Sequence, residues 1–183
     1  MVKIMWLTAL VCLLPLNGWS AIMSVEPSDS IVNVGDTFTV DLVADLALGE
    51  SVLGWGLDLT FDDAVFSQIA SPTIGSNWIP VMALDGDGLA GLAFPFPVSG
   101  TDVLLATLSF EAISVGTVNF VLGVTNGDLT EGLPLAFPAP PGTFTELTFN
   151  NASVTSVPGP STILRMLTGL VGFAFPNRIN KQA

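Results

Sequence analysis

Acidic side chains are the main candidates for chemistry in this chain, and two of them share one glycine-rich loop. Asp85 and Asp87 lie two residues apart in the segment Asp-Gly-Asp-Gly. Carboxylates on a flexible backbone bind calcium in exported proteins, so these two residues are candidate calcium ligands. A complete EF-hand loop needs more oxygen ligands and a closing glutamate, and Phe96-Pro97 stands in that place. A plain hairpin turn is the alternative interpretation of the loop.

Few other side chains can act in catalysis or metal binding, because the chain has no histidine, no tyrosine and a single cysteine. The missing histidine removes the commonest general base and the commonest zinc ligand. Cys12 lies in an N-terminal apolar run, so the rest of the chain has no disulfide or thiolate chemistry. No cofactor other than calcium is indicated. Trp55 and Trp78 are candidates for stacking on sugar rings, with core packing as the alternative.

Charge is divided between the middle of the 183-residue chain and its ends. All sixteen acidic residues lie between Glu26 and Glu146, and no lysine or arginine occurs from residue 4 to residue 164. Nucleic-acid binding needs basic residues that release counterions from phosphates, so this pattern excludes a nucleic-acid partner. Anionic lipid surfaces would also repel the middle region. A negative charge of this size is typical of an exported domain that attracts cations or basic partners. The alternative is that the acidic residues serve only to keep the domain soluble.

Residues 1–20 have the layout of a secretory signal peptide, which we expect to be helical. Lys3 gives the positive N-terminal charge, residues 4–16 form an apolar run, and small residues follow. This pattern predicts export and cleavage after Ser20, with cleavage after Ala21 as the second choice. An uncleaved membrane anchor is the alternative.

Residues 157–183 combine a proline-rich break, a short apolar segment and a basic end. About 13 apolar residues at ~1.5 Å rise would span roughly 20 Å, against a hydrocarbon core of ~30 Å. Basic residues beyond the segment favour a cytoplasmic C-terminus, with the acidic domain on the other side of the membrane. The pattern predicts a short transmembrane helix, and a helix packed on the domain is the alternative. The break consists of Val157, Pro158, Gly159, Pro160 and Ser161, and the tail carries Ile163, Arg165, Phe175, Arg178 and Lys181.

This C-terminal region resembles the PEP-CTERM sorting signal of exopolysaccharide-producing Gram-negative bacteria. That signal has a Val-Pro-Glu-Pro-Ser/Thr core, a short Leu/Gly-rich transmembrane helix and an arginine-rich end. Here Gly159 replaces the glutamate, and the tail has two separated cations instead of a cluster. The resemblance implies an exosortase-type processing enzyme as a partner. It also implies transient anchoring in the inner membrane through the C-terminal helix, followed by location in the outer envelope or outside the cell.

Residues 24–156 show the pattern of β-structure. Apolar and polar side chains alternate in residues 37–45 and 104–111, and Val118, Phe120 and Leu122 form a third alternating set. Glycine- and aspartate-containing turns separate the segments. Short strands with regular turns predict an antiparallel β-sandwich. The further strand candidates are residues 31–34, 52–61, 65–70, 78–83, 89–96 and 144–154.

The order of these segments resembles cohesin domains. Residues 31–40 are similar to the family's opening Val-x-x-Gly-Asp-x-Phe-x-Val strand, and residues 54–66 to its Gly-Phe-x-Phe-x-Leu-x-Phe/Tyr-Asp-Pro-x-Val strand and turn, with Asp63 in place of proline. Residues 104–112 with Gly116 are similar to a later strand. The resemblance implies an all-β, antiparallel jelly-roll β-sandwich of about nine strands over residues 24–156, similar in fold to some carbohydrate-binding modules. Cohesins bind dockerin modules through one sheet face, which implies a dockerin-like partner.

These features favour a non-catalytic, exported, cohesin-like binding or scaffold module that is sorted by a PEP-CTERM-like tail. The first alternative is a carbohydrate-binding module acting on exopolysaccharide, which requires Trp55 or Trp78 to be exposed on a sheet face. The second alternative is a glycoside hydrolase, which requires two carboxylates roughly 5–10 Å apart in a cleft. The exposure of these side chains discriminates between the three hypotheses.

Overall fold

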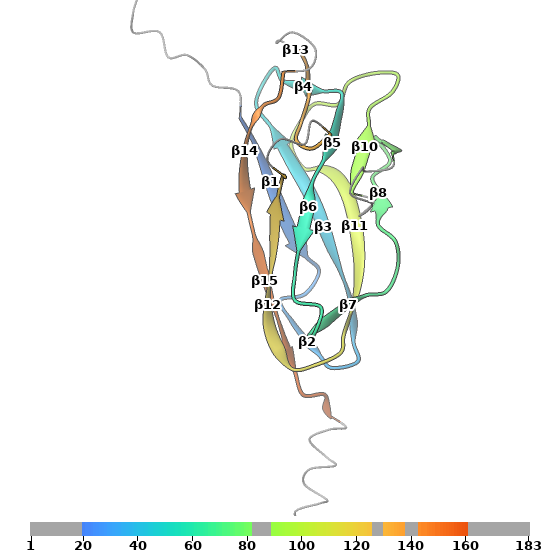
Figure 1. Cartoon of the computed structure of the whole chain (residues 1–183), viewed down its shortest axis with the longest axis vertical. Coiled ribbons are helices and arrows are strands. Elements are labelled where there is room, and N and C mark those ends of the chain that lie inside the picture. Colours follow the sequence, from blue (N-terminus) through green and yellow to red (C-terminus); the bar gives the residue numbers. More distant parts are fainter. Residues whose placement is uncertain (1–19, 82–88, 126–129, 138–142, 161–183) are drawn as a thin grey trace, which may run out of the picture.

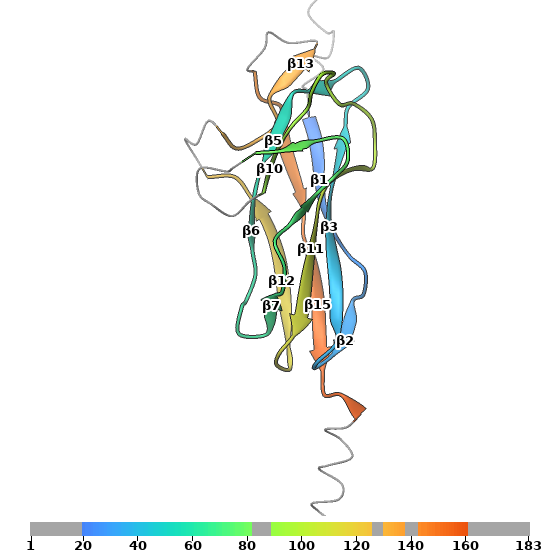
Figure 2. The same cartoon turned by 90° about the vertical axis from the view of Figure 1, so that its right-hand side faces the viewer.

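The computed structural model describes residues 20–81, 89–125, 130–137 and 143–160. Two main sheets contain most of the strand residues, and shorter strands extend them at one end (Figures 1 and 2). The strands are β1 (Ser20–Pro27), β2 (Ile31–Asn33), β3 (Thr37–Leu46), β4 (Ser51–Val52), β5 (Gly54–Gly56), β6 (Asp58–Thr60), β7 (Phe66–Gln68), β8 (Thr73–Ile74), β9 (Ile79–Pro80), β10 (Ala90–Leu92), β11 (Val103–Ala112), β12 (Gly116–Gly123), β13 (Leu135–Phe137), β14 (Glu146–Asn150) and β15 (Ala152–Val157).

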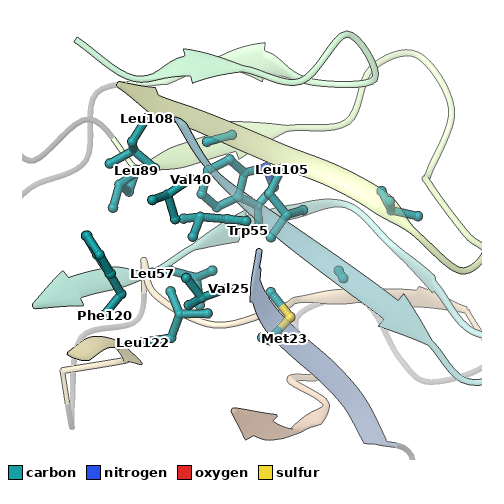
Figure 3. Packing of buried hydrophobic residues seen from close by; sticks show 14 of the residues in the cluster. Met23, Val25, Val40, Trp55, Leu57, Leu89, Leu105, Leu108, Phe120 and Leu122 are labelled. Carbon is teal, nitrogen blue, oxygen red and sulfur yellow. The ribbon is translucent and has the colours of Figure 1, made fainter. Parts of the chain in front are cut away.

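The first sheet has the order β14-β1-β3-β11-β7, with β8 also paired to β11, and the second has the order β2-β15-β12-β6. The short sheets β5-β10-β9 and β13-β4 continue the sandwich. Buried side chains such as Met23, Val40, Trp55 and Leu122 fill the space that the strands enclose (Figure 3). The predicted all-β sandwich is therefore confirmed.

Alternation of side chains explains why these segments form strands. In β3, Phe38, Val40 and Leu42 are buried while the residues between them are partly exposed. Strand β12 follows the same rule with the three residues expected from the sequence. Because successive side chains of a strand point to opposite faces, one face of each strand covers the core.

Five phenylalanine rings form the densest part of the core. Their centroids lie 5.0–6.2 Å apart, in both edge-to-face and stacked pairs. Such pairs add about 0.5–1.5 kcal/mol each beyond the burial of apolar area. The rings come from both main sheets and from the end of β6, so they hold the two layers together. The five residues are Phe38, Phe61, Phe66, Phe110 and Phe120.

Strand β11 departs from the predicted alternation. The sequence placed Leu104 on the core face, but this side chain is exposed and Leu105 is buried instead. The register with β3 shifts between Leu104 and Ala106, which is a β-bulge. The bulge turns the first part of the strand over, so Leu105 and Ala106 both reach the core.

The prediction of a purely antiparallel sandwich of about nine strands needs correction. Two pairs are parallel, β1 with β14 and β15 with β2. They arise because the chain crosses from one main sheet to the other both between β1 and β2 and between β14 and β15. The predicted strand 144–154 is thus two strands, and Asn151 separates them. Its Oδ1 accepts a hydrogen bond from the Leu122 N–H (3.0 Å).

The single strand predicted over residues 52–61 is divided into three. Strand β4 pairs with β13, β5 with β10, and β6 with β12. The chain stays extended but changes its partner at each break, which accounts for two of the additional strands among the fifteen in the described residues. At the last break, the Leu57 N–H donates to the Leu89 carbonyl (3.1 Å).

Strand β1 begins before residue 24, where the sequence placed the start of the domain. It runs from Ser20, and the side chains of Ala21 and Met23 are fully buried. The predicted cleavage after Ser20 would leave these two residues in place. The signal peptide and the C-terminal helix that the sequence predicts lie outside the described residues, except for their boundary residues. Within the described ranges, no helix is long and apolar enough to cross a membrane.

Candidate functional site

The predicted calcium ligands Asp85 and Asp87 lie in the segment 82–88, outside the described residues. In the part of the chain that the structure describes, no group of three or more acidic, histidine or cysteine side chains is arranged to hold a metal ion.

Both candidate sugar-stacking tryptophans belong to the core. Trp55 is 3% exposed and Trp78 is 5% exposed, and their rings meet edge to face at 6.4 Å. The Trp78 indole N–H donates to the Leu104 carbonyl (2.9 Å). Neither ring reaches the surface, so they do not form the platform that a carbohydrate-binding module would need.

The proline-rich break is folded onto the domain up to its fourth residue. Val157 ends β15, and its carbonyl accepts a hydrogen bond from the Val34 N–H (2.9 Å). Gly159 is buried, and a Cβ there would lie 3.4 Å from the Val34 carbonyl oxygen. Pro158 and Pro160 are exposed. Ser161 lies outside the described residues, as do the tail residues Ile163, Arg165, Phe175, Arg178 and Lys181.

The turn between β2 and β3 supports this contact through one aspartate. Asp36 Oδ2 accepts hydrogen bonds from the Asn33 side chain (2.8 Å) and from its main-chain N–H (3.0 Å). These bonds, the side-chain one first, lower the pKa of Asp36 below its ordinary value. The turn therefore places the Val34 carbonyl and the Asn33 side chain, which Asp36 holds, close to Gly159.

The most prominent surface feature is apolar and lies on β9 and β10. The Trp78 side chain faces the core. The side of Gly91 on which a Cβ would stand also faces the core, because that Cβ would contact the two tryptophans. The neighbouring residues Ile79 and Leu92, which are paired across the two strands, therefore face outward. They are 47% and 46% exposed.

Two more exposed apolar side chains follow β10 in the chain. Phe94 and Phe96 are 71% and 78% exposed, and both precede prolines. The main chain is fixed on either side of this excursion: the Ala93 N–H donates to the Leu53 carbonyl (2.7 Å), and Val98 forms a β-bridge with Val52. Proline restricts the backbone between the two fixed points. We define the apolar surface as Ile79, Val81, Leu92, Phe94 and Phe96.

The sequence contains a signal for this surface, but the strand predicted over residues 89–96 includes Phe94 and Phe96. The segment Phe-Pro-Phe-Pro at residues 94–97 lies partly within the predicted strand 89–96. Two alternating prolines are poor strand residues, because each lacks the N–H that a ladder requires. An apolar segment that cannot be a central strand is a signal for an exposed loop with a contact role.

A surface cavity of about 440 Å³ lies near one end of the sandwich, between the β3–β4 loop and residues 99–101. Among the described residues, Glu50 is the only acidic one that lines it, and this side chain is 3% exposed. Burial raises the pKa of Glu50 above its ordinary value, and the hydrogen bond from the Ala47 N–H opposes this effect. Neither the sequence pattern nor the family resemblance indicated this residue.

Comparison with solved structures finds cohesin modules. The third ScaB cohesin of R. flavefaciens, solved in complex with a group 1 dockerin, has 12% identity and a TM-score of 0.58, and the match covers 79% of this chain and all of the other. A non-cellulosomal cohesin from Archaeoglobus fulgidus has 14% identity, a TM-score of 0.53 and coverage of 80% and 97%. The cohesin module of a Clostridium perfringens family 33 glycoside hydrolase has 11% identity, a TM-score of 0.54 and coverage of 78% and 98%. No family model and no curated protein matches the sequence. The domain of this chain has a cohesin-like fold.

Proposed function

We propose that this protein is an exported, non-catalytic binding module, which docks a partner protein on the apolar surface and is sorted by a PEP-CTERM-like tail. The cohesin-like fold supports a binding role, since one of the similar structures is a cohesin bound to a dockerin. The partner of this chain is a protein module with a dockerin-like role.

The observation that carries the proposal is the apolar surface on an acidic domain. Exposed apolar patches on soluble proteins mark interaction sites, and exposed aromatic side chains are frequent anchors of interfaces. The prolines after Phe94 and Phe96 restrict the loop before it binds, which reduces the entropy lost on docking. The domain contains no basic residue, so a partner with basic groups around an apolar centre fits its charge.

The direction of the chain supports a tethered module. The chain leaves β15 at the end that carries β2, whereas β10 lies in the opposite half (Figure 1). A module anchored through its C-terminal tail would therefore hold this surface away from the membrane.

The lining of the cavities favours binding over hydrolysis. A second cavity of about 260 Å³ is lined by Ser28, Thr37, Phe38, Thr39, Ile69 and Ser109, and it contains no carboxylate. The cavity near Glu50 contains one. Glycoside hydrolysis uses a pair of carboxylates across the bond, and the described residues of these two cavities do not supply that pair.

Binding is tested with the full-length protein and two matched double variants. Phe94→Ser/Phe96→Ser removes the aromatic anchors, and Ile113→Ser/Val115→Ser removes two exposed apolar side chains from the β11–β12 turn at the other end. Each protein is immobilised and exposed to envelope extract of the producing bacterium. The captured protein is identified by mass spectrometry, and its affinity is measured with purified material.

We expect wild type and the control variant to bind the same partner, and the Phe94/Phe96 variant to lose at least tenfold in affinity, because aromatic anchors dominate interface energies. Circular dichroism confirms that the variants are folded. Equal binding by all three proteins would refute the apolar surface as the docking site. Retention of polysaccharide instead of protein would refute the protein-binding role.

Sorting is tested by fractionation of the full chain against a chain ending at Pro160. We expect wild type to reside in the inner membrane before it reaches the outer envelope or the medium, and the truncated chain to be soluble after export. A soluble wild-type protein that still carries Lys181 would refute the anchoring tail.

A further inference from the structure

The cavity at the β3–β4 loop has the chemistry of a cation site that the domain itself cannot fill. It lies at the end of the sandwich that carries β4 and β13, opposite the end that carries β2 (Figures 1 and 2). Its volume of about 440 Å³ is in the range of small-molecule sites. The lining residues are Leu46, Ala47, Leu48, Gly49, Glu50, Ser51, Ser99, Gly100 and Thr101.

Glu50 is buried with only half of its carboxylate engaged. Oε2 accepts a hydrogen bond from the Ala47 N–H at 3.3 Å, which is long for a bond to a charged acceptor. Oε1 is shielded from water and has no hydrogen-bond partner. Buried carboxylates are normally paired with a cation or fully hydrogen-bonded, because removing a charge from water is costly.

No cation within the domain can supply the missing partner. The chain has no lysine, arginine or histidine from residue 4 to residue 164. Two more acids stand next to the lining residues in the chain: Asp45 precedes Leu46, and Asp102 follows Thr101. Asp45 Oδ1 accepts a hydrogen bond from the Asp102 main-chain N–H (2.8 Å), so the Asp45 carboxylate lies beside the segment that carries Ser99, Gly100 and Thr101. The local field therefore favours a cation from outside.

The donor set discriminates between the kinds of cation. Calcium takes six to eight oxygen ligands, usually from several carboxylates, whereas this cavity offers a single carboxylate. A guanidinium group pairs best with two free oxygens in a fork, but Oε2 of Glu50 is already engaged. A primary ammonium is a compact charge with three donors, and it needs only one carboxylate oxygen and neighbouring hydroxyls. Ser51, Ser99 and Thr101 provide such hydroxyl groups in the lining.

The apolar part of the lining completes the match. Leu46, Ala47 and Leu48 are also among the lining residues, so the cavity adds apolar groups to its single described carboxylate, as the methylene groups of an alkyl chain require. We propose that the cavity is a binding site for a primary alkylammonium group, presented either by a lysine side chain of a protein or by a free amine. This inference does not rest on the docking role of the apolar surface.

Entry of the ammonium group requires a small movement of the β3–β4 turn, because Oε1 is closed to water. The turn is held by the bond from the Glu50 N–H to the Ala47 carbonyl (2.9 Å). Leu48 at its tip is completely exposed and makes no core packing, so displacing the tip exposes no buried apolar side chain. Gly49 has a φ of +87°, which a residue without Cβ adopts readily.

The test uses the full-length protein with n-butylammonium and Nα-acetyl-lysine amide as probes at pH 7. Glu50→Gln removes the charge at constant shape, and Asp63→Asn removes one charge from an exposed carboxylate elsewhere. Binding is followed by NMR shifts of the Leu48, Gly49 and Glu50 amides. n-Butanol serves as the uncharged probe, and N-methylguanidinium tests the preference between cations.

We expect millimolar binding of both ammonium probes to wild type and to Asp63→Asn, and at least a tenfold loss in Glu50→Gln. n-Butanol and N-methylguanidinium should bind at least tenfold more weakly. Unchanged affinity in Glu50→Gln, equal binding of butanol, or no binding of either ammonium probe would each refute the site. Tighter binding of the lysine amide than of butylammonium would identify a protein lysine as the source, and the reverse would identify a free amine.

Discussion

The buried carboxylate of Glu50 leads to a prediction about stability and pH. The side chain is 3% exposed, one oxygen has no partner, and burial raises the pKa of this group above its ordinary value of 4.5. Glu50→Gln keeps the shape and an acceptor for the Ala47 N–H, but the side chain no longer ionises. We expect the variant to be more stable than wild type at pH 7.

The sign follows from the two protonation states. Below pH 4.5, Glu50 is protonated in both the folded and the unfolded chain, so its charge has no effect on the free energy of unfolding. As the pH rises from 4.5 through the raised pKa of the folded state, the unfolded chain ionises more easily and the folded state loses stability. The loss is complete once the pH lies well above the raised pKa of the folded state. A group whose pKa is lowered on folding would give the opposite slope.

The expected size comes from the missing partner. An unsatisfied buried polar group costs about 1–3 kcal/mol, and about 1 kcal/mol shifts Tm by roughly 2–4 °C in a domain of this size. The amide of the variant also leaves a group unpaired, so we expect a gain near the lower end, about 1 kcal/mol at pH 7. Thermal unfolding of both full-length proteins is measured at pH 4 and pH 7. The reasoning is refuted if the difference in Tm between the two proteins is the same at both values, or if wild type is the more stable at pH 7.

Three further substitutions test the packing of the sandwich by denaturant unfolding. Phe120→Ala removes one ring of the five-ring cluster and should lower the free energy of unfolding by about 3–5 kcal/mol; a loss under 1 kcal/mol would contradict the role of the cluster. Gly91→Ala places a Cβ 2.5 Å from the Trp55 indole nitrogen and should cost about 1–3 kcal/mol through overpacking, which a neutral result would disprove. Asn151→Ala removes the acceptor for a β12 N–H and should cost about 1 kcal/mol, and an increase in stability would argue against that bond.

The alternation of side chains predicted the strands that lie wholly within one sheet. Strands β3 and β12 expose one face and bury the other, so a period of two is visible in their sequences. The same reasoning failed where the backbone changes direction or partner. The bulge at Leu104–Ala106 is set by pairing with β3, and the crossing at Asn151 by contact with β12. Both depend on residues far away in the sequence.

The candidate sites were harder to predict than the fold, because exposure depends on the tertiary structure. Trp55 and Trp78 have the composition of a sugar platform, but the missing side chain of Gly91 makes room for both rings inside the core. Phe94 and Phe96 have the composition of a core strand, yet the chain leaves the sheet between its contacts at Ala93 and Val98. Local sequence pattern cannot distinguish these two outcomes.

Glu50 links stability and binding in one measurement. A glutamate that served only to hold the β3–β4 turn would lower stability when replaced, since its hydrogen bond to Ala47 would be weakened. A glutamate that awaits an external ammonium group does the opposite: the empty site is strained by an unpaired charge, and the bound site is relieved. Replacement by glutamine should therefore raise Tm without amine and abolish the increase in Tm that amine produces in wild type. Binding residues often lower the stability of the folded protein, because function requires a polar group that has no hydrogen-bond partner within the protein. A higher Tm without amine, together with the loss of the increase that amine produces, would distinguish a binding residue from a structural one.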